Sequence, residues 1–106
     1  MTETKIYVGL NDAVTRKQKY SVERYTGILK QICFSYHVAF SVSLSQGGYF
    51  HEDGQYTEEN SLILTLIDTD KTLVEEIAKD LCVFFNQESV LITEDQVKAY
   101  YIQEKL

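Results

Sequence analysis

Eight residues in the middle of the chain, 38–45, alternate strictly between large apolar and small side chains. Successive side chains of a β-strand point to opposite faces, so this pattern predicts a strand with one face against a core and one small, polar face. The apolar set is Val38, Phe40, Val42 and Leu44, and the small set is Ala39, Ser41, Ser43 and Ser45. Three further segments have strand character: 5–10, 62–67 and 88–93.

Two segments have the apolar spacing of amphipathic helices. The first is predicted to begin after Ser21, whose hydroxyl can accept a hydrogen bond from a free backbone N–H of the first turn, and its apolar stripe reaches Cys33. The second begins after Asp70 or Thr72, which are both suitable caps. Asn86 can supply the left-handed residue that ends it.

The order strand, helix, strand, strand, helix, strand predicts an α+β fold of the ferredoxin-like βαββαβ type. Its four-stranded antiparallel sheet would carry both helices on one face. A length of 106 residues is that of a single domain, so one domain is expected over 1–106. Within it, 94–106 is a C-terminal extension that fits either a strand or a helix.

The stretch 47–60, "GGYFHEDGQYTEEN", is rich in acidic, aromatic and glycine residues. Asp53-Gly54 is a strong signal for a two-residue hairpin turn, in which both residues need positive φ. This turn would place His51 opposite Tyr56, an ordinary cross-strand pair. If the hairpin contacts a partner, the candidate residues are His51, Glu52, Asp53, Tyr56, Glu58 and Glu59.

The sheet face away from the helices is predicted to be too apolar to stay in water, which is typical of an interface or a ligand cleft. A homodimer through this face is expected, although the C-terminal segment could cover it instead. The residues expected on the face are Tyr7, Ala39, Ser41, Ser43, Ile63, Thr65, Ile67, Leu91 and Thr93, with Tyr7, Ile63, Thr65, Ile67 and Leu91 as its candidate contact residues.

Side chains with metal or acid–base chemistry are few. A zinc-compatible set of two cysteines and two histidines exists, but its spacing is poor and both cysteines lie on apolar stripes, so no metal and no cofactor are expected. The set is Cys33, His37, His51 and Cys82.

The run "NQESVLI" offers Gln87, Glu88 and Ser89, which Glu59 could approach. A carboxylate pair there could do acid–base work if burial raised one pKa. Capping of the preceding helix by Gln87 and Ser89 is the favoured interpretation, so no catalytic residue is assigned.

The net charge is −6, from 10 basic and 16 acidic residues. This balance argues against a protein that binds nucleic acid directly, because such binding neutralises phosphates with basic side chains. It leaves a basic protein partner open. No apolar run approaches the ~18 residues of a membrane span, so no membrane is expected. The N-terminus lacks the pattern of a secretory signal, which predicts a cytoplasmic location.

Several short motifs resemble a bacterial family of small proteins that are often predicted lipoproteins and whose function is not known. The motifs are "KIYVGL", "SVERY", "GGYFHEDGQYTEENSLIL" and, most distinctively, "FFNQESVLI" with its Gln-Glu-Ser-Val run. The resemblance implies the same fold and no activity. Its matched positions are Tyr7, Gly9, Leu10, Gly48, Asp53, Gly54, Glu59, Phe85, Gln87, Glu88, Ser89 and Val90.

Two functional hypotheses are consistent with the sequence. The first is a non-enzymatic protein-interaction module. Its most specific form is a small acidic inhibitor from a phage or mobile element, of the anti-CRISPR type, which acts on a basic nucleic-acid-binding protein. The alternative is a cofactor-free enzyme or ligand-binding dimer of the same fold, with an organic substrate near Tyr7, His51, Tyr56 and Glu59. The sequence favours the first hypothesis, so the protein is expected not to be an enzyme.

Overall fold

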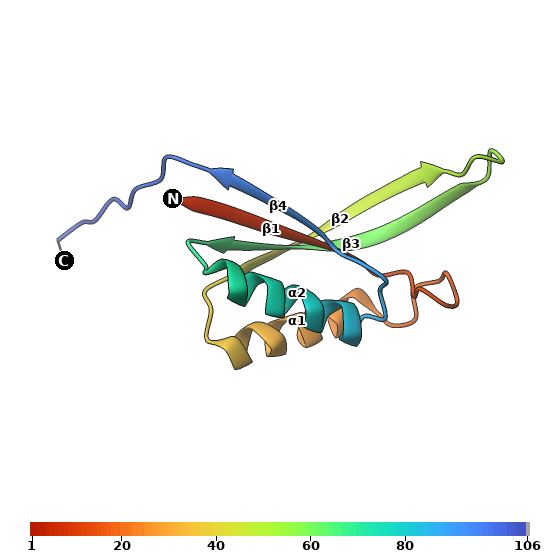
Figure 1. Cartoon of the computed structure of the whole chain (residues 1–106), viewed down its shortest axis with the longest axis horizontal. Coiled ribbons are helices and arrows are strands. Elements are labelled where there is room, and N and C mark those ends of the chain that lie inside the picture. Colours follow the sequence, from red (N-terminus) through yellow and green to blue (C-terminus); the bar gives the residue numbers. More distant parts are fainter. Residues whose placement is uncertain (106) are drawn as a thin grey trace.

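The computed structural model, which describes residues 1–105, has the predicted element order. The elements are β1 (Thr2–Gly9), α1 (Val22–Tyr36), β2 (Ser41–Phe50), β3 (Tyr56–Ile67), α2 (Lys71–Phe84) and β4 (Leu91–Gln96). The strands form one antiparallel sheet in the order β2-β3-β1-β4, and both helices lie against the same face of it (Figure 1). The predicted ferredoxin-like fold is confirmed.

The core lies between the sheet and the two helices. Alternate residues of β1 and β3 point into it, which is why Ile6, Val8 and Leu64 are fully buried while their sequence neighbours are only half-buried. Each such aliphatic side chain contributes roughly 1.5–3 kcal/mol to folding. From the helices, the buried partners are Tyr25, Leu29, Ile32, Cys33, Val74, Ile77, Ala78 and Leu81.

The helix ends follow the predicted capping chemistry. Ser21 caps α1 by accepting from the Arg24 N–H. Of the two possible N-caps of α2, Asp70 is the one used: its carboxylate accepts a hydrogen bond from the Thr72 N–H at 3.1 Å. Asn86 follows the helix with φ 48°, so its predicted left-handed conformation is confirmed.

The hairpin between β2 and β3 extends beyond the body of the sheet as a two-stranded arm (Figure 1). β1 pairs with β3 only from Ser61 onward, whereas β2 and β3 stay paired out to Phe50 and Tyr56. Such an isolated hairpin is marginally stable alone. Because the arm extends beyond the core, apolar side chains on it are exposed to solvent, and Phe50 at its end is 74% exposed.

The predicted turn of this arm is wrong by one residue. His51 donates its N–H to the Gln55 carbonyl, so three residues form the loop, and of Asp53 and Gly54 only Gly54 has a positive φ, 86°. A three-residue loop ending in a left-handed glycine is a common alternative to the two-residue turn. Phe50 consequently pairs with Tyr56, and His51 does not lie opposite Tyr56.

The C-terminal segment also differs from its prediction. β4 begins at Leu91 and continues to Gln96, so the boundary expected at 94 cuts through a strand. Residues 97–105 form neither helix nor strand and lead away from the body (Figure 1). They leave the open face of the sheet uncovered.

Candidate functional site

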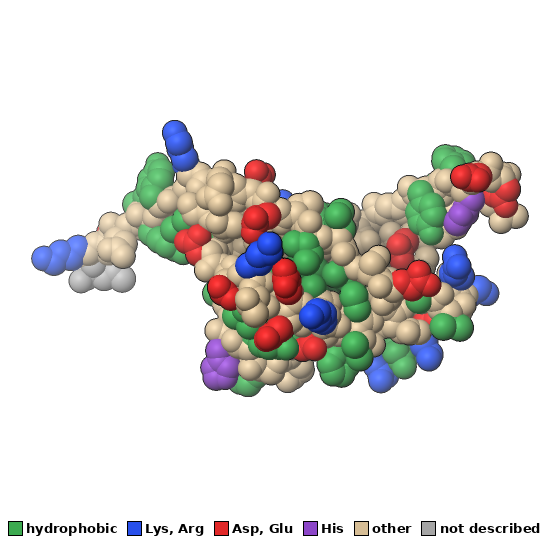
Figure 2. Space-filling model, in the orientation of Figure 1, with side chains coloured by type: hydrophobic (Ala, Val, Ile, Leu, Met, Phe, Trp, Pro, Cys, Tyr) green, Lys and Arg blue, Asp and Glu red, His purple; other side chains and the backbone are tan. Residues whose placement is uncertain are grey.

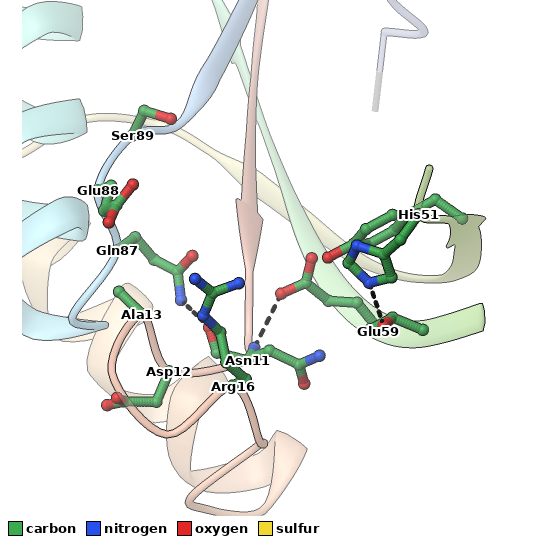
Figure 3. Close-up of a pocket in the computed structure, with 11 residues that line it drawn as sticks. Asn11, Asp12, Ala13, Arg16, His51, Glu59, Gln87, Glu88 and Ser89 are labelled. Carbon is green, nitrogen blue, oxygen red and sulfur yellow. Dashed lines mark hydrogen bonds between the residues drawn. The ribbon is translucent and has the colours of Figure 1, made fainter. Parts of the chain in front are cut away.

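A hollow of about 340 Å³ lies where the arm faces the loop after β1 and the connection between α2 and β4. The arm supplies Tyr49, His51, Thr57 and Glu59; the β1–α1 loop supplies Asn11, Asp12, Ala13 and Arg16; the α2–β4 connection supplies Gln87, Glu88 and Ser89 (Figure 3). Figure 2 shows acidic and basic side chains close to one another where the arm joins the body of the protein. Three separate segments thus bring charge of both signs to one place.

Glu59 lies at the centre of the hollow. Its Oε2 accepts the Asn11 backbone N–H at 3.0 Å (Figure 3). The carboxylate can lie there because Gly9 has no side chain: a Cβ on Gly9 would meet Glu59 Oε2 at 2.5 Å. The glycine at the end of β1 therefore makes room for the carboxylate over the open face of the sheet.

The loop after β1 is held by a buried carboxylate. Asp12 accepts from the backbone N–H groups of Val14 and Thr15 and from the Asn86 side-chain amide at 2.9 Å. The Asn86 amide, with help from the two N–H groups, lowers the pKa of Asp12 below its ordinary value of 3.8. Because Ala13 also donates its N–H to the Asn86 carbonyl, the end of α2 fixes the position of this loop.

The run Gln87, Glu88 and Ser89 comes close to Glu59, as the sequence suggested, since all four side chains line the hollow. Gln87 donates its amide to the Asn11 carbonyl at 2.7 Å and to the Phe85 carbonyl at 3.3 Å. The bond to Phe85 is the predicted capping of the helix end, and the bond to Asn11 links the end of α2 to the β1–α1 loop. Glu88 and Ser89 stay exposed at the rim.

The arm presents one of its two faces to the hollow. His51 Nε2 and Thr57 Oγ1 are 2.7 Å apart, and the Tyr49 and His51 rings meet edge to face at 5.0 Å. The corrected register causes this grouping, because Tyr49 pairs with Thr57 and shares a face with His51. An aromatic ring beside polar groups suits a ligand with a planar base.

The other predicted site residues lie elsewhere. Tyr56 and Glu58 line a different hollow, on the opposite face of the arm, and Glu52 and Asp53 are in the turn. On the open sheet face, Ile67 and Leu91 are exposed, and the remaining three candidates are half-buried: Tyr7, Ile63 and Thr65. Of the six predicted hairpin residues, the structure brings only His51 and Glu59 into the main hollow.

Sequence reasoning missed Asn11, Arg16, Tyr49 and Thr57. The segment "NDAVTR", residues 11–16, is polar and carries no motif typical of a binding site. A signal was present, because a polar loop directly after a buried strand ends at the edge of the sheet, where side chains from several segments converge.

Among residues 1–105, no group of three or more metal-binding side chains could hold a metal ion. Cys33 and Cys82 are both free thiols, and burial raises the pKa of the Cys33 thiol to about 11, so it stays protonated. The zinc-compatible set of the sequence does not form a cluster.

A second, more apolar hollow of about 740 Å³ lies between α1 and α2. Its charged residues are Arg24 and Asp80, and Asp80 accepts the Tyr36 hydroxyl at 2.7 Å. This bond raises the pKa of Tyr36 to about 12. Because Asp80 is engaged in this way, this hollow has fewer charged groups available to a ligand than the hollow around Glu59.

Fold and hollow together define a class: a ferredoxin-like α+β protein with a charged, half-open pocket beside the open face of its sheet. Two solved structures of phage SAM lyase are similar to this chain. The complex with S-methyl-5′-thioadenosine is 28% identical, with a TM-score of 0.69, and the match covers 90% of this chain and 80% of that chain. The apo state is 25% identical, with a TM-score of 0.68 and coverage of 96% and 92%.

More distant structures share the fold alone. CutA from Pyrococcus horikoshii is 14% identical, with a TM-score of 0.57, and the match covers 95% of this chain and 88% of that chain. No family model and no curated protein matches the chain. The resemblance to a bacterial family of predicted lipoproteins therefore stays a prediction.

The similarity to phage SAM lyase corrects the functional prediction. The sequence favoured a non-enzymatic acidic inhibitor with a basic protein partner, and this is wrong, because the similar structures are of an enzyme with a small-molecule ligand. The expectation that the protein is not an enzyme is wrong for the same reason. The alternative, a small-molecule enzyme of ferredoxin-like fold, agrees better with these matches.

None of the helices formed by residues 1–105 is both long and apolar enough to cross a membrane.

Proposed function

We propose that this protein is a lyase that cleaves S-adenosylmethionine and releases S-methyl-5′-thioadenosine. The observation that carries the proposal is the 28% identity to a phage SAM lyase over 90% of this chain. The hollow around Glu59 supports it, because a ligand-sized pocket with a few convergent polar groups is the usual form of a small-molecule site.

The reaction needs no cofactor and no water. The bond between the sulfonium sulfur and the γ-carbon of the amino-acid chain breaks, and its electron pair leaves with the sulfur as neutral S-methyl-5′-thioadenosine. The γ-carbon gains a bond from the substrate's own carboxylate oxygen, which closes homoserine lactone. Atoms and charge balance without proton transfer, so the protein acts mainly by holding the substrate in a reactive geometry.

Glu59 is the central binding group in this scheme. Its carboxylate is half-buried and fixed by the Asn11 N–H, so it can pair with a positive group of the substrate. Tyr49 and His51 offer ring faces and edges for the adenine. A negative charge near a sulfonium stabilises the substrate before its charge is lost, so Glu59 acts more on KM than on kcat.

The active protein is a homo-oligomer, of which the homodimer predicted from the sequence is one form. The support is a set of apolar side chains that are about half or more exposed: Leu44 on β2, Phe50 and Tyr56 on the arm, and Leu91 on β4. Sedimentation of the full chain measures the number of copies, and a monomer at all concentrations would contradict this part. A cytoplasmic location, where S-adenosylmethionine is made, stays a prediction.

The proposal is tested by incubating the purified chain with S-adenosylmethionine in H₂¹⁸O and identifying the products by mass spectrometry. A lyase yields S-methyl-5′-thioadenosine and a four-carbon product with no ¹⁸O on its γ-carbon, even after the lactone opens. An ¹⁸O-labelled γ-hydroxyl would identify a hydrolase, and absence of any S-methyl-5′-thioadenosine would refute the proposal.

Glu59→Gln keeps the shape of the side chain and removes its charge. We expect kcat/KM to fall about 10- to 100-fold, the equivalent of the roughly 1.5–3 kcal/mol of a hydrogen bond to a charged group. Glu75→Gln, on the exposed side of α2, is the matched control and should keep wild-type activity. Equal activity of the two variants would show that Glu59 takes no part in substrate binding.

A further inference from the structure

Arg16 is a cation at the hollow that no protein group neutralises within residues 1–105. Its side chain lines the hollow, and Figure 3 shows the guanidinium pointing into the space between Gln87 and Glu59. The ion pair found in the described part of the chain joins Lys5 to Glu3, on β1, and does not involve Arg16. The guanidinium is thus available to a ligand.

The backbone at Arg16 is held in an unusual conformation. Its φ is 62°, in the left-handed region that residues with a side chain rarely adopt. The Arg16 N–H donates to the Asp12 carbonyl at 2.8 Å, and Asp12 is itself fixed by Asn86. Residues kept in such conformations cluster at ligand sites, where the surrounding structure overcomes the strain.

The charges around the hollow match those of one class of ligand. S-adenosylmethionine carries two positive groups, its sulfonium and its ammonium, and one negative group, its carboxylate. Three carboxylates line the hollow, but Asp12 is buried and already accepts three hydrogen bonds. The charged groups left for a ligand are therefore Glu59, Glu88 and the guanidinium of Arg16. A guanidinium binds a carboxylate through two parallel hydrogen bonds, which fixes orientation as well as position.

We propose that Arg16 binds the α-carboxylate of the substrate and so selects sulfonium compounds that retain their amino-acid end. This inference rests on the proposed function. It makes Arg16 a specificity residue, because the carboxylate that it orients is the group that must reach the γ-carbon. S-methyl-5′-thioadenosine has no carboxylate, so Arg16 contributes to binding of the substrate and not to binding of this product.

The test compares two non-reactive ligands by calorimetry on the full chain: sinefungin, which keeps the amino-acid carboxylate, and S-methyl-5′-thioadenosine, which lacks it. We expect Arg16→Gln to weaken sinefungin binding about 10- to 100-fold, as expected for loss of a charge-assisted hydrogen-bonded pair, and to leave S-methyl-5′-thioadenosine binding within twofold. Arg16→Lys should recover part of the loss. Lys17→Gln, which removes the neighbouring exposed charge, should change neither affinity.

Arg16→Gly separates binding from folding. Glycine adopts φ 62° without strain, so this variant should melt at or above the wild-type temperature and still lose sinefungin affinity. Equal weakening of both ligands, or no weakening of sinefungin, would overturn the role of Arg16. If the wild-type chain binds neither ligand and releases no S-methyl-5′-thioadenosine, the proposed function itself fails, and this inference falls with it.

Discussion

A single methyl group at Gly9 should disable the site without unfolding the protein. In Gly9→Ala the new Cβ would lie 2.5 Å from Glu59 Oε2, 2.7 Å from Cδ and 2.9 Å from Oε1. The carboxylate has to move by about 0.9 Å before the nearest of these contacts reaches the 3.4 Å of ordinary van der Waals distance. This movement also breaks or stretches the 3.0 Å hydrogen bond from Asn11.

The effect on stability should be small because two terms oppose each other. Alanine restricts the unfolded chain and stabilises by ~0.4–1 kcal/mol where its conformation is allowed, and Gly9 has no positive φ. Loss of the Asn11 hydrogen bond costs about 0.5–1.5 kcal/mol, because both residues are only half-buried and water can replace the lost partner. We therefore expect the melting temperature to stay within about 4 °C of the wild type, since ~1 kcal/mol shifts it by roughly 4–8 °C in a domain of this size.

The effect on activity should approach that of removing the Glu59 charge, about 10- to 100-fold in kcat/KM. The assay is release of S-methyl-5′-thioadenosine by Gly9→Ala, Glu59→Gln and the double variant. If Gly9 acts only through Glu59, the double variant is no worse than Glu59→Gln alone. Gly47→Ala is the matched control, because a Cβ on this strand glycine meets nothing within 4 Å.

Two results would refute this reasoning. Full activity in Gly9→Ala would mean that the position of Glu59 does not matter. Equal losses in Gly9→Ala and Gly47→Ala would mean that glycine in this part of the sheet matters for another reason, such as flexibility of the arm.

Three further outcomes can be measured by thermal or denaturant unfolding. Gly27→Ala, in the exposed interior of α1 with nothing within 4 Å of its Cβ, should stabilise by up to ~1 kcal/mol; a lower melting temperature would contradict this. Leu64→Ala, at a fully buried position of β3, should cost ~2–5 kcal/mol, and a cost below that range would contradict its place in the core. The folded pKa of Asp12 is lowered, so its stabilisation is present above the ordinary pKa of 3.8 and is lost as the pH falls through the folded value. The melting-temperature difference between wild type and Asp12→Asn should therefore shrink from pH 7 to pH 3, and a constant difference would refute the assignment.

The sequence alone determined the fold because its signals are local. Alternation marks the strands, apolar stripes mark the helices, and Ser21 and Asn86 mark helix ends through hydrogen bonds within a few residues. The choice between Asp70 and Thr72 stayed open because both side chains satisfy the same local requirement.

The turn register was also within reach of the sequence. A two-residue turn at Asp53-Gly54 would pair Leu44 with Ile63 and so join the core face of one strand to the open face of the next. The three-residue loop pairs Leu44 with Leu62 and keeps both apolar sets on one side. Burial of a whole face outweighs the local preference of two turn residues.

Only the tertiary structure decided the site. Arg16, Glu59 and Gln87 lie far apart in the chain and meet because β1 ends where the arm begins and α2 returns beside it (Figure 3). No periodicity encodes that meeting, and the space that admits Glu59 is the missing side chain of Gly9, on another strand. Local patterns fix which face of each element is apolar; the packing of those faces fixes which polar ends converge.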